Sequence, residues 1–201
     1  MEGRYLCDGR DRPGRGMGLR IPEWSGQPVL EAGDAEIWED RGYLYVRKKW
    51  NANGHLDLSL PMKPVLMEAH PGVRMDCGKA AIQYGPLVYC VEEEDNDGDL
   101  FDCILTGNSR LEAGFEENLL GGICTIQVQG IRRNREQWKG RLYQPVSRRY
   151  FEPVKLKAVP YYAWANRGAG KMNVWMNHIP DMEHRENEGT DKDKADRGKI
   201  R

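Results

Sequence analysis

The sequence has no apolar run as long as the roughly 18–20 residues that a membrane-spanning helix needs, and its N-terminus lacks the apolar core of a secretory signal. It also lacks an excess of either charge, with 30 Lys and Arg against 31 Asp and Glu and a formal net charge of −1. Such a balance predicts no basic face for nucleic acid or for an anionic membrane. We therefore expect neither partner, and we expect the protein in the cytoplasm.

Cysteine is sparse, and no two cysteines have the spacing of a C-x-x-C pair. Zinc ligands usually come in such close pairs, so the spacing does not predict a zinc site. Cys90 and Cys124 lie in apolar, strand-like runs, where a thiol behaves as a small hydrophobic group. We expect free, structural thiols at all five positions. They are Cys7, Cys77, Cys90, Cys103 and Cys124.

The common catalytic signatures are missing as well. No histidine belongs to an H-E-x-x-H or His-x-His pattern, and no serine lies in G-x-S-x-G. Glu116 and Glu117 are adjacent, so on a strand their side chains would point to opposite faces. Glycosidase carboxylates must instead face each other across a cleft at about 5–10 Å. We interpret this pair as part of a solvated loop and assign no catalytic residue.

Short strand-like runs separated by Gly, Pro and Asn fill most of the chain. The central stretch is Lys79–Val91, KAAIQYGPLVYCV, which predicts a buried strand, a bend at Gly85-Pro86 and a second strand covered on both faces. Tyr43–Leu60 predicts a hairpin, with alternate leucines of HLDLSL facing inward. Turns about eight to twelve residues apart indicate an all-β chain, folded as a jelly-roll-like antiparallel sandwich.

Composition divides the chain into four parts. Residues 1–18 are rich in Gly and Arg without periodicity and predict a disordered leader. We expect a small, incomplete sheet unit over residues 19–75 and a larger sandwich over residues 76–178. Residues 179–201 are rich in charged residues and predict a disordered tail.

The acidic run EEEDNDGD after the central stretch resembles a calcium loop at first sight. Asp95, Asp97 and Asp99 alternate as calcium ligands would. However, the glycine that the motif requires after the third of these residues is replaced by Leu100, and Gly98 lies two places too early. The sequence therefore favours a solvated acidic turn over a calcium site.

Aromatic residues are the best candidates for ligand contact. Tyr161, Tyr162, Trp164 and Trp175 gather near one predicted turn. Aromatic faces stack on the C–H faces of sugars, so a carbohydrate platform is one interpretation. The other, which we favour, is that the two tryptophans plug the ends of the sandwich.

Several segments together carry a family likeness. In chain order they are Leu19–Trp24, Gly42–Leu44, Leu58–Met62, Gln83–Cys90, Leu119–Gly122 and Val159–Gly168. The most specific are QYGPLVYC and PYYAWANRG. Over about residues 19–176 the chain resembles the C-terminal half of glycoside hydrolase family 127, the β-L-arabinofuranosidase family.

The resemblance implies that β-sandwich domains follow an (α/α)6 barrel in which a cysteine nucleophile and a glutamate act at a zinc-bound cysteine cluster. The family's Cys-Cys-x-x-Asn segment has no match here, so no catalytic or zinc residue is carried over. We expect a non-catalytic portion, without a cofactor of its own, that supports such a barrel. Its partners would be a barrel chain or a second copy, bound through an exposed edge at Leu19–Ile21 and Tyr43–Val46. The alternatives are a free-standing carbohydrate-binding module and an independent enzyme.

Overall fold

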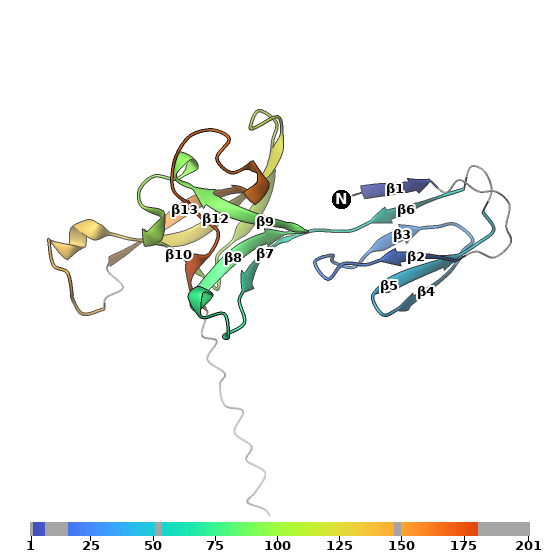
Figure 1. Ribbon diagram of the computed structural model, residues 1–201, viewed down its shortest axis with the longest axis horizontal. Coiled ribbons are helices and arrows are strands. Elements are labelled where there is room, and N and C mark those ends of the chain that lie inside the picture. Colours follow the sequence, from blue (N-terminus) through green and yellow to red (C-terminus); the bar gives the residue numbers. More distant parts are fainter. Residues whose placement is uncertain (1, 7–15, 51–53, 147–149, 181–201) are drawn as a thin grey trace, which may run out of the picture.

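The computed structural model describes residues 2–6, 16–50, 54–146 and 150–180 (Figure 1). Cys7 and the charged tail from residue 181 onward lie outside the described residues. Within the described ranges the regular structure consists of β-strands and short 3₁₀ turns, which confirms the all-β prediction. No helix in those ranges is long and apolar enough to span a membrane.

The first unit contains two three-stranded antiparallel sheets, with strand orders β1-β6-β3 and β2-β5-β4. The strands are β1 (Glu2–Leu6), β2 (Gly16–Arg20), β3 (Val29–Glu31), β4 (Glu36–Asp40), β5 (Tyr43–Arg47) and β6 (His55–Ser59). The two sheets share one core, in which Leu19 and Val46 of the second sheet pack with Leu56 and Leu58 of the first. The inward direction predicted for these two leucines of β6 is confirmed.

The predicted hairpin over Tyr43–Leu60 is wrong. β5 pairs with β2 and β4, whereas β6 pairs with β1 and β3, so the chain crosses from one sheet to the other between them. The hairpin partner of β5 is β4, through a turn in which Arg41 and Gly42 both have positive φ. Alternation of apolar residues determines which face of a strand is buried, but it does not choose the neighbouring strand.

Two further expectations for the N-terminal region need correction. The leader predicted to be disordered contains β1, which pairs along its whole length with β6, and the first residues of β2. The apolar edge predicted at Tyr43–Val46 is not an edge, because β5 is the central strand of its sheet. Val46 is completely buried and Leu19 is nearly so. The edges of this sheet are β2 and β4.

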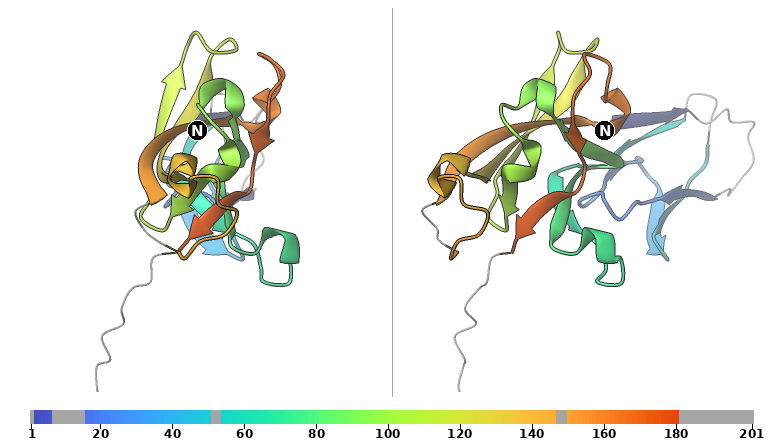
Figure 2. Two further views of the ribbon diagram at one scale, coloured as in Figure 1. Left: turned by 90° about the vertical axis from the view of Figure 1, so that its left-hand side faces the viewer. Right: turned by 60° about the vertical axis from the view of Figure 1, so that its left-hand side comes forward.

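The second unit is a closed barrel of six strands rather than the expected sandwich. Its pairings run β9-β13-β12-β10-β15-β8 and close through the β8–β9 hairpin (Figure 2). The strands of the unit are β7 (Pro64–Glu68), β8 (Lys79–Tyr84), β9 (Leu87–Glu92), β10 (Cys103–Thr106), β11 (Leu111–Glu116), β12 (Ile123–Arg133), β13 (Phe151–Pro160), β14 (Met172–Asn173) and β15 (Met176–Ile179). One pairing in the ring, β10 with β15, is parallel. Because β7 pairs with β8, this unit begins at Pro64, not at residue 76.

The central stretch folds as predicted, with a turn at Gly85-Pro86 between two strands. Gly85 has a φ of +56°, and a Cβ placed on it would lie 2.1 Å from the Sδ atom of Met62. In β9, Tyr89 and Val91 face the barrel core, and Cys90 between them packs into a second cluster with Val159. All three successive residues of β9 are at most 1% exposed. The prediction that the strand is covered on both faces therefore holds from Tyr89 to Val91 but is wrong for Val88, which is 46% exposed.

Candidate functional site

The predicted aromatic residues follow β13 at one end of the barrel. Tyr161 and Tyr162 lie in the 3₁₀ turn η6 (Tyr161–Ala163), and Trp164 comes directly after it. The rings of Tyr161 and Trp164 are stacked, with centroids 6.1 Å apart and planes 14° from parallel. Both rings are exposed, as is Tyr162. This exposure does not fit a tryptophan at position 164 that plugs the barrel.

Trp175 lies between β14 and β15 and is half-buried. Among the ring contacts of the described residues, none joins it to the other three aromatic residues. Of the four predicted site residues, the structure thus brings Tyr161 and Trp164 into direct contact.

The loop that carries these aromatic residues is fixed by Arg167. Its guanidinium group donates hydrogen bonds to Glu92 and to both carboxylate oxygens of Asp95, one of them at 2.7 Å. The backbone N–H of Ala165 donates to Glu92 Oε1 at 3.0 Å. These side chains are almost buried, with 15% of Arg167, 8% of Glu92 and 9% of Asp95 exposed. The aromatic loop is therefore clamped to the end of β9.

A second cation extends this cluster across the sheet. Lys157 of β13 lies 3.4 Å from Asp95 and 2.9 Å from Glu116 at the end of β11. Thr125 Oγ1 donates to the other carboxylate oxygen of Glu116 at 2.8 Å. The Asn96 side chain bridges the backbone of Lys157 in both directions, accepting from its N–H and donating to its carbonyl. We call Glu92, Asp95, Glu116, Lys157 and Arg167 the charge cluster.

The environment keeps the carboxylates of Asp95 and Glu116 ionised. Burial alone would raise the pKa of Asp95, but the hydrogen bonds and charge of Arg167, then of Lys157, lower it overall. The hydrogen bonds from Lys157 and Thr125 lower the pKa of Glu116. Hydrogen bonding to Asp95 raises the pKa of Arg167 despite its burial. A general acid needs a raised pKa instead, so this arrangement stabilises the loop and does not suit proton donation.

The charge cluster corrects two sequence interpretations. The run after β9 is not simply a solvated acidic turn, because Glu92, Asp95 and Asn96 point into the structure. Glu116 likewise ends a strand and binds Lys157 rather than lying on a solvated loop. Within the ranges described, no three His, Cys, Asp or Glu residues come together as a metal-binding group.

The described cysteines are free, as predicted, namely Cys77, Cys90, Cys103 and Cys124. Burial raises the pKa of Cys90 to about 12, so it remains a neutral thiol and is a poor nucleophile. A separate groove of about 520 Å³ lies over β12 and β13 and is lined by polar groups that include Ser109, Gln129 and Lys155. The Ser109 hydroxyl already accepts from the backbone N–H of Thr106 at 2.8 Å. Neither feature assembles a nucleophile with a base.

Comparison with known proteins identifies the family to which this chain belongs. The family model described as the glycoside hydrolase family 127 C-terminal domain matches residues 64–177, which is more than half of the chain. The chain belongs to glycoside hydrolase family 127. The match begins at the first strand of the barrel unit and ends within its last strand. This confirms the resemblance drawn from the sequence motifs.

Individual relatives agree. A non-reducing end β-L-arabinofuranosidase of Bifidobacterium longum subsp. longum is 36% identical over 173 residues, covering 79% of this chain and 25% of the relative. The crystal structure of a GH127 β-L-arabinofuranosidase from Geobacillus stearothermophilus T6 superposes with a TM-score of 0.75 at 36% identity, over 88% of this chain and 27% of that one. A further GH127 β-arabinofuranosidase gives a TM-score of 0.71 at 25% identity, covering 88% and 30% of the two chains. The chain thus spans about a quarter of the length of its GH127 relatives.

Sequence reasoning found the aromatic loop but missed the charge cluster. Arg167 belongs to the quoted PYYAWANRG segment, yet it received no role there. Its partners Glu92 and Asp95 lie more than 70 residues earlier in the chain. Two sequence features could have indicated the charge cluster. One is a single arginine in an aromatic loop that is followed by glycine, and the other is an acidic run that contains no cation.

Proposed function

We propose that this GH127 chain is a non-catalytic part of a β-L-arabinofuranosidase-like enzyme and supports a catalytic (α/α)6 barrel. The relatives named above are arabinofuranosidases, and the chain corresponds to about a quarter of each. The carboxylates of the charge cluster support this role, because they share cations instead of facing each other across a cleft.

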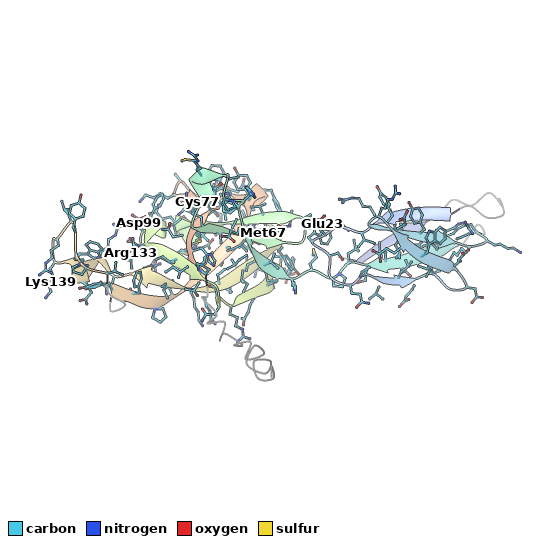
Figure 3. All side chains as sticks on the ribbon, turned by 90° about the horizontal axis from the view of Figure 1, so that it is seen from below. Glu23, Met67, Cys77, Asp99, Arg133 and Lys139 are labelled. Carbon is cyan, nitrogen blue, oxygen red and sulfur yellow. The ribbon has the colours of Figure 1, made fainter. Side chains whose placement is uncertain are left out.

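The observation that carries the proposal is an arm, residues 139–146, that projects from the barrel; we call it the apolar arm for the three large apolar side chains that it exposes among polar ones. It follows the 3₁₀ turn η4 (Arg135–Trp138), and Lys139 marks its position at the end of the molecule opposite the first unit (Figure 3). Leu142, Tyr143 and Val146 on this arm are 84%, 91% and 99% exposed. Large apolar side chains with so little cover indicate a surface that another protein part covers. We assign that part to the catalytic barrel.

The proposal also says where the zinc ion that the family resemblance implies would be bound. The resemblance places zinc at a cysteine cluster of the catalytic barrel. Of the cysteines described here, Cys90 and Cys103 are buried and Cys77 is exposed, and no metal-ligand group forms among the described residues. These residues do not fit a zinc site, so we place the metal of the complete enzyme outside this domain.

Association is the test. The chain would be mixed with the separately expressed catalytic part of the Bifidobacterium relative and examined by size-exclusion chromatography with light scattering. We expect a 1:1 complex with the summed mass. A chain that elutes unchanged in the mixture would contradict the proposal, and a dimer of the chain alone would assign the arm to a second copy.

A second function is supported by the exposed Tyr161–Trp164 stack on its clamped loop. Parallel, exposed aromatic rings held at a fixed position suit the C–H face of a sugar, so the loop is a candidate carbohydrate contact. Tyr162 would flank the stack, whereas half-buried Trp175 is not joined to it by any described ring contact. Titration of tryptophan fluorescence with arabino-oligosaccharides, in the wild type and in Trp164→Ala, tests this candidate. Equal responses of the two proteins would rule it out.

A further inference from the structure

The outer face of the β2-β5-β4 sheet has an unusual composition. Leu44 and Val46 of β5 face the shared core, so the alternate residues Tyr43, Tyr45 and Arg47 face outward. The strand register sets their neighbours in three rows across the sheet. The rows are Gly16–Arg47–Glu36, Gly18–Tyr45–Trp38 and Arg20–Tyr43–Asp40. This outer face contains aromatic, charged and glycine residues and not one aliphatic side chain.

The aromatic rings on this outer face form one continuous group. Trp38 and Tyr45 are stacked, with ring centroids 5.3 Å apart and planes 10° from parallel. The Tyr43 ring follows at 6.1 Å from that of Tyr45. Trp38 and Tyr43 remain 36% and 41% exposed. Ring surface is therefore open to solvent along the rows.

Two glycines of β2 leave room for these rings. A Cβ on Gly18 would lie 3.1 Å from the Tyr45 ring, and a Cβ on Gly16 would lie 4.0 Å from the end of the Trp38 indole. Gly16 and Trp38 are on opposite edge strands with β5 between them. The indole thus extends across the sheet, and the glycines make the outer face broad and shallow.

Charged groups border the rings. Arg47 Nη1 lies 3.1 Å from Glu36 Oε2, and the Arg47 guanidinium carbon is 5.1 Å from the centre of the Trp38 ring. Together with Arg20 and Asp40, the outer face holds two positive and two negative side chains. Its neutral charge balance suits a neutral ligand, and these four side chains supply both donors and acceptors of hydrogen bonds.

We propose that the outer face of the β2-β5-β4 sheet binds a neutral oligosaccharide. Sugar rings present a C–H face that packs on aromatic rings, while their hydroxyl groups bond to the bordering arginine and carboxylate groups. Because the outer face is charge-balanced, it does not attract nucleic acid. This inference concerns the first unit and does not depend on the proposed support of a catalytic barrel.

Affinity electrophoresis tests the proposal with the full chain. Native gels would each contain one neutral polysaccharide, namely arabinan, xylan or hydroxyethyl cellulose, and a gel without polymer gives the reference mobility. We expect the wild type to be retarded in at least one polymer gel. Trp38→Ala and Tyr45→Ser should each weaken that retardation by about tenfold or more in apparent dissociation constant. Gly18→Val should weaken it as well, because it displaces the rings without removing them.

Matched control variants distinguish this outer face from the rest of the surface. Ile37→Ala changes the neighbouring residue of β4, whose side chain points to the opposite face and is 44% exposed, and it should keep the wild-type retardation. Trp164→Ala, which alters the other candidate sugar contact, is measured in the same gels. No retardation in any gel, or equal retardation of Trp38→Ala and Ile37→Ala, would overturn the proposal. Loss in Trp164→Ala alone would also overturn it and would place sugar binding at the loop after β13. Circular dichroism confirms that each variant is folded.

Discussion

Arg167 and Asp95 form a two-pronged ion pair, in which each terminal nitrogen of the guanidinium group donates to one carboxylate oxygen. The pair joins the loop after β13 to the turn after β9, 72 residues apart in sequence. Glu92 binds the same guanidinium group from the end of β9. One arginine thus joins the aromatic loop to two carboxylates at the end of β9.

Removal of that arginine is the first test of this relationship. Arg167→Met would leave Glu92 and Asp95 buried without their main cation, so we expect the free energy of unfolding to fall by about 3–5 kcal/mol. Arg167→Lys keeps the charge but loses the two-pronged geometry, so its free energy of unfolding should lie between those of Arg167→Met and the wild type. Urea denaturation measures both values.

The control for this prediction is an exposed pair of the same chemistry. Arg110 lies 2.7 Å from Glu112, and both side chains are more than half exposed. Arg110→Met should therefore change the free energy of unfolding by no more than about 1 kcal/mol. Equal losses in Arg167→Met and Arg110→Met would show that the charge cluster is not a structural anchor.

Acidification should weaken the fold through the same cluster. The folded-state pKa values of Asp95 and Glu116 lie below their ordinary values, chiefly through Arg167 for Asp95, against the effect of burial, and through Lys157 for Glu116. A carboxyl group whose pKa is lowered in the folded state contributes stability at a pH above its pKa in the unfolded state, which is about 4. This contribution is lost as the pH falls through the pKa of the folded state. We expect the urea concentration at the unfolding midpoint to decrease once the pH is below about 4. This decrease should be less steep in Asp95→Asn. Parallel curves for the two proteins would contradict this assignment.

The turn at Gly85 provides a test of the barrel's central hairpin. Gly85→Ala would impose a positive φ on a residue with Cβ and would place that atom against Met62, so we expect a loss of about 1–3 kcal/mol. Gly114→Ala is the matched control, because nothing lies within 4 Å of its added Cβ and its effect should stay within about 0.5 kcal/mol. Thermal or urea unfolding of the two variants checks the difference. A Gly85→Ala protein as stable as Gly114→Ala would mean that the turn is not under this constraint.

The apolar arm gives a prediction about binding rather than stability. Serine at Leu142, Tyr143 and Val146 should leave the free energy of unfolding within about 0.5 kcal/mol, because these side chains have almost no cover. The same triple variant should weaken binding to the catalytic part of a relative by about tenfold or more, measured by calorimetry. Phe101→Ser, which changes an exposed apolar residue elsewhere, should bind as the wild type does. Unchanged binding of the triple variant would assign the interface to another surface.

The sequence predicted those parts of the fold that local signals determine. The turn at Gly85-Pro86 and the burial of Leu56 and Leu58 follow from backbone restrictions and from period-two alternation, and both are confirmed. Which strands become neighbours depends on contacts distant in sequence. That is why the expected β5–β6 hairpin was wrong, and why closure of the barrel through β8 and β9 was not foreseen.

The candidate sites likewise divide into those that local sequence signals reveal and those that depend on contacts distant in sequence. A run such as PYYAWANRG stands out by its aromatic content alone, so Tyr161 and Trp164 could be chosen from sequence. The charge cluster could not, because Asp95, Glu116 and Lys157 become partners only when three separate segments meet. The stacked rings of Trp38 and Tyr45 were hidden for a related reason, since they lie on different strands and depend on the register between β4 and β5.

The proposed support of a catalytic barrel is best tested by hydrolysis of an aryl β-L-arabinofuranoside. The purified chain would be assayed alone and then mixed with the separately expressed catalytic part of a GH127 relative. We predict no hydrolysis by the chain alone, and higher activity or greater thermal stability of activity in the mixture than for the catalytic part by itself. Hydrolysis by the chain alone that is lost in Glu116→Gln would contradict the non-catalytic role, because it would show a catalytic site within these residues.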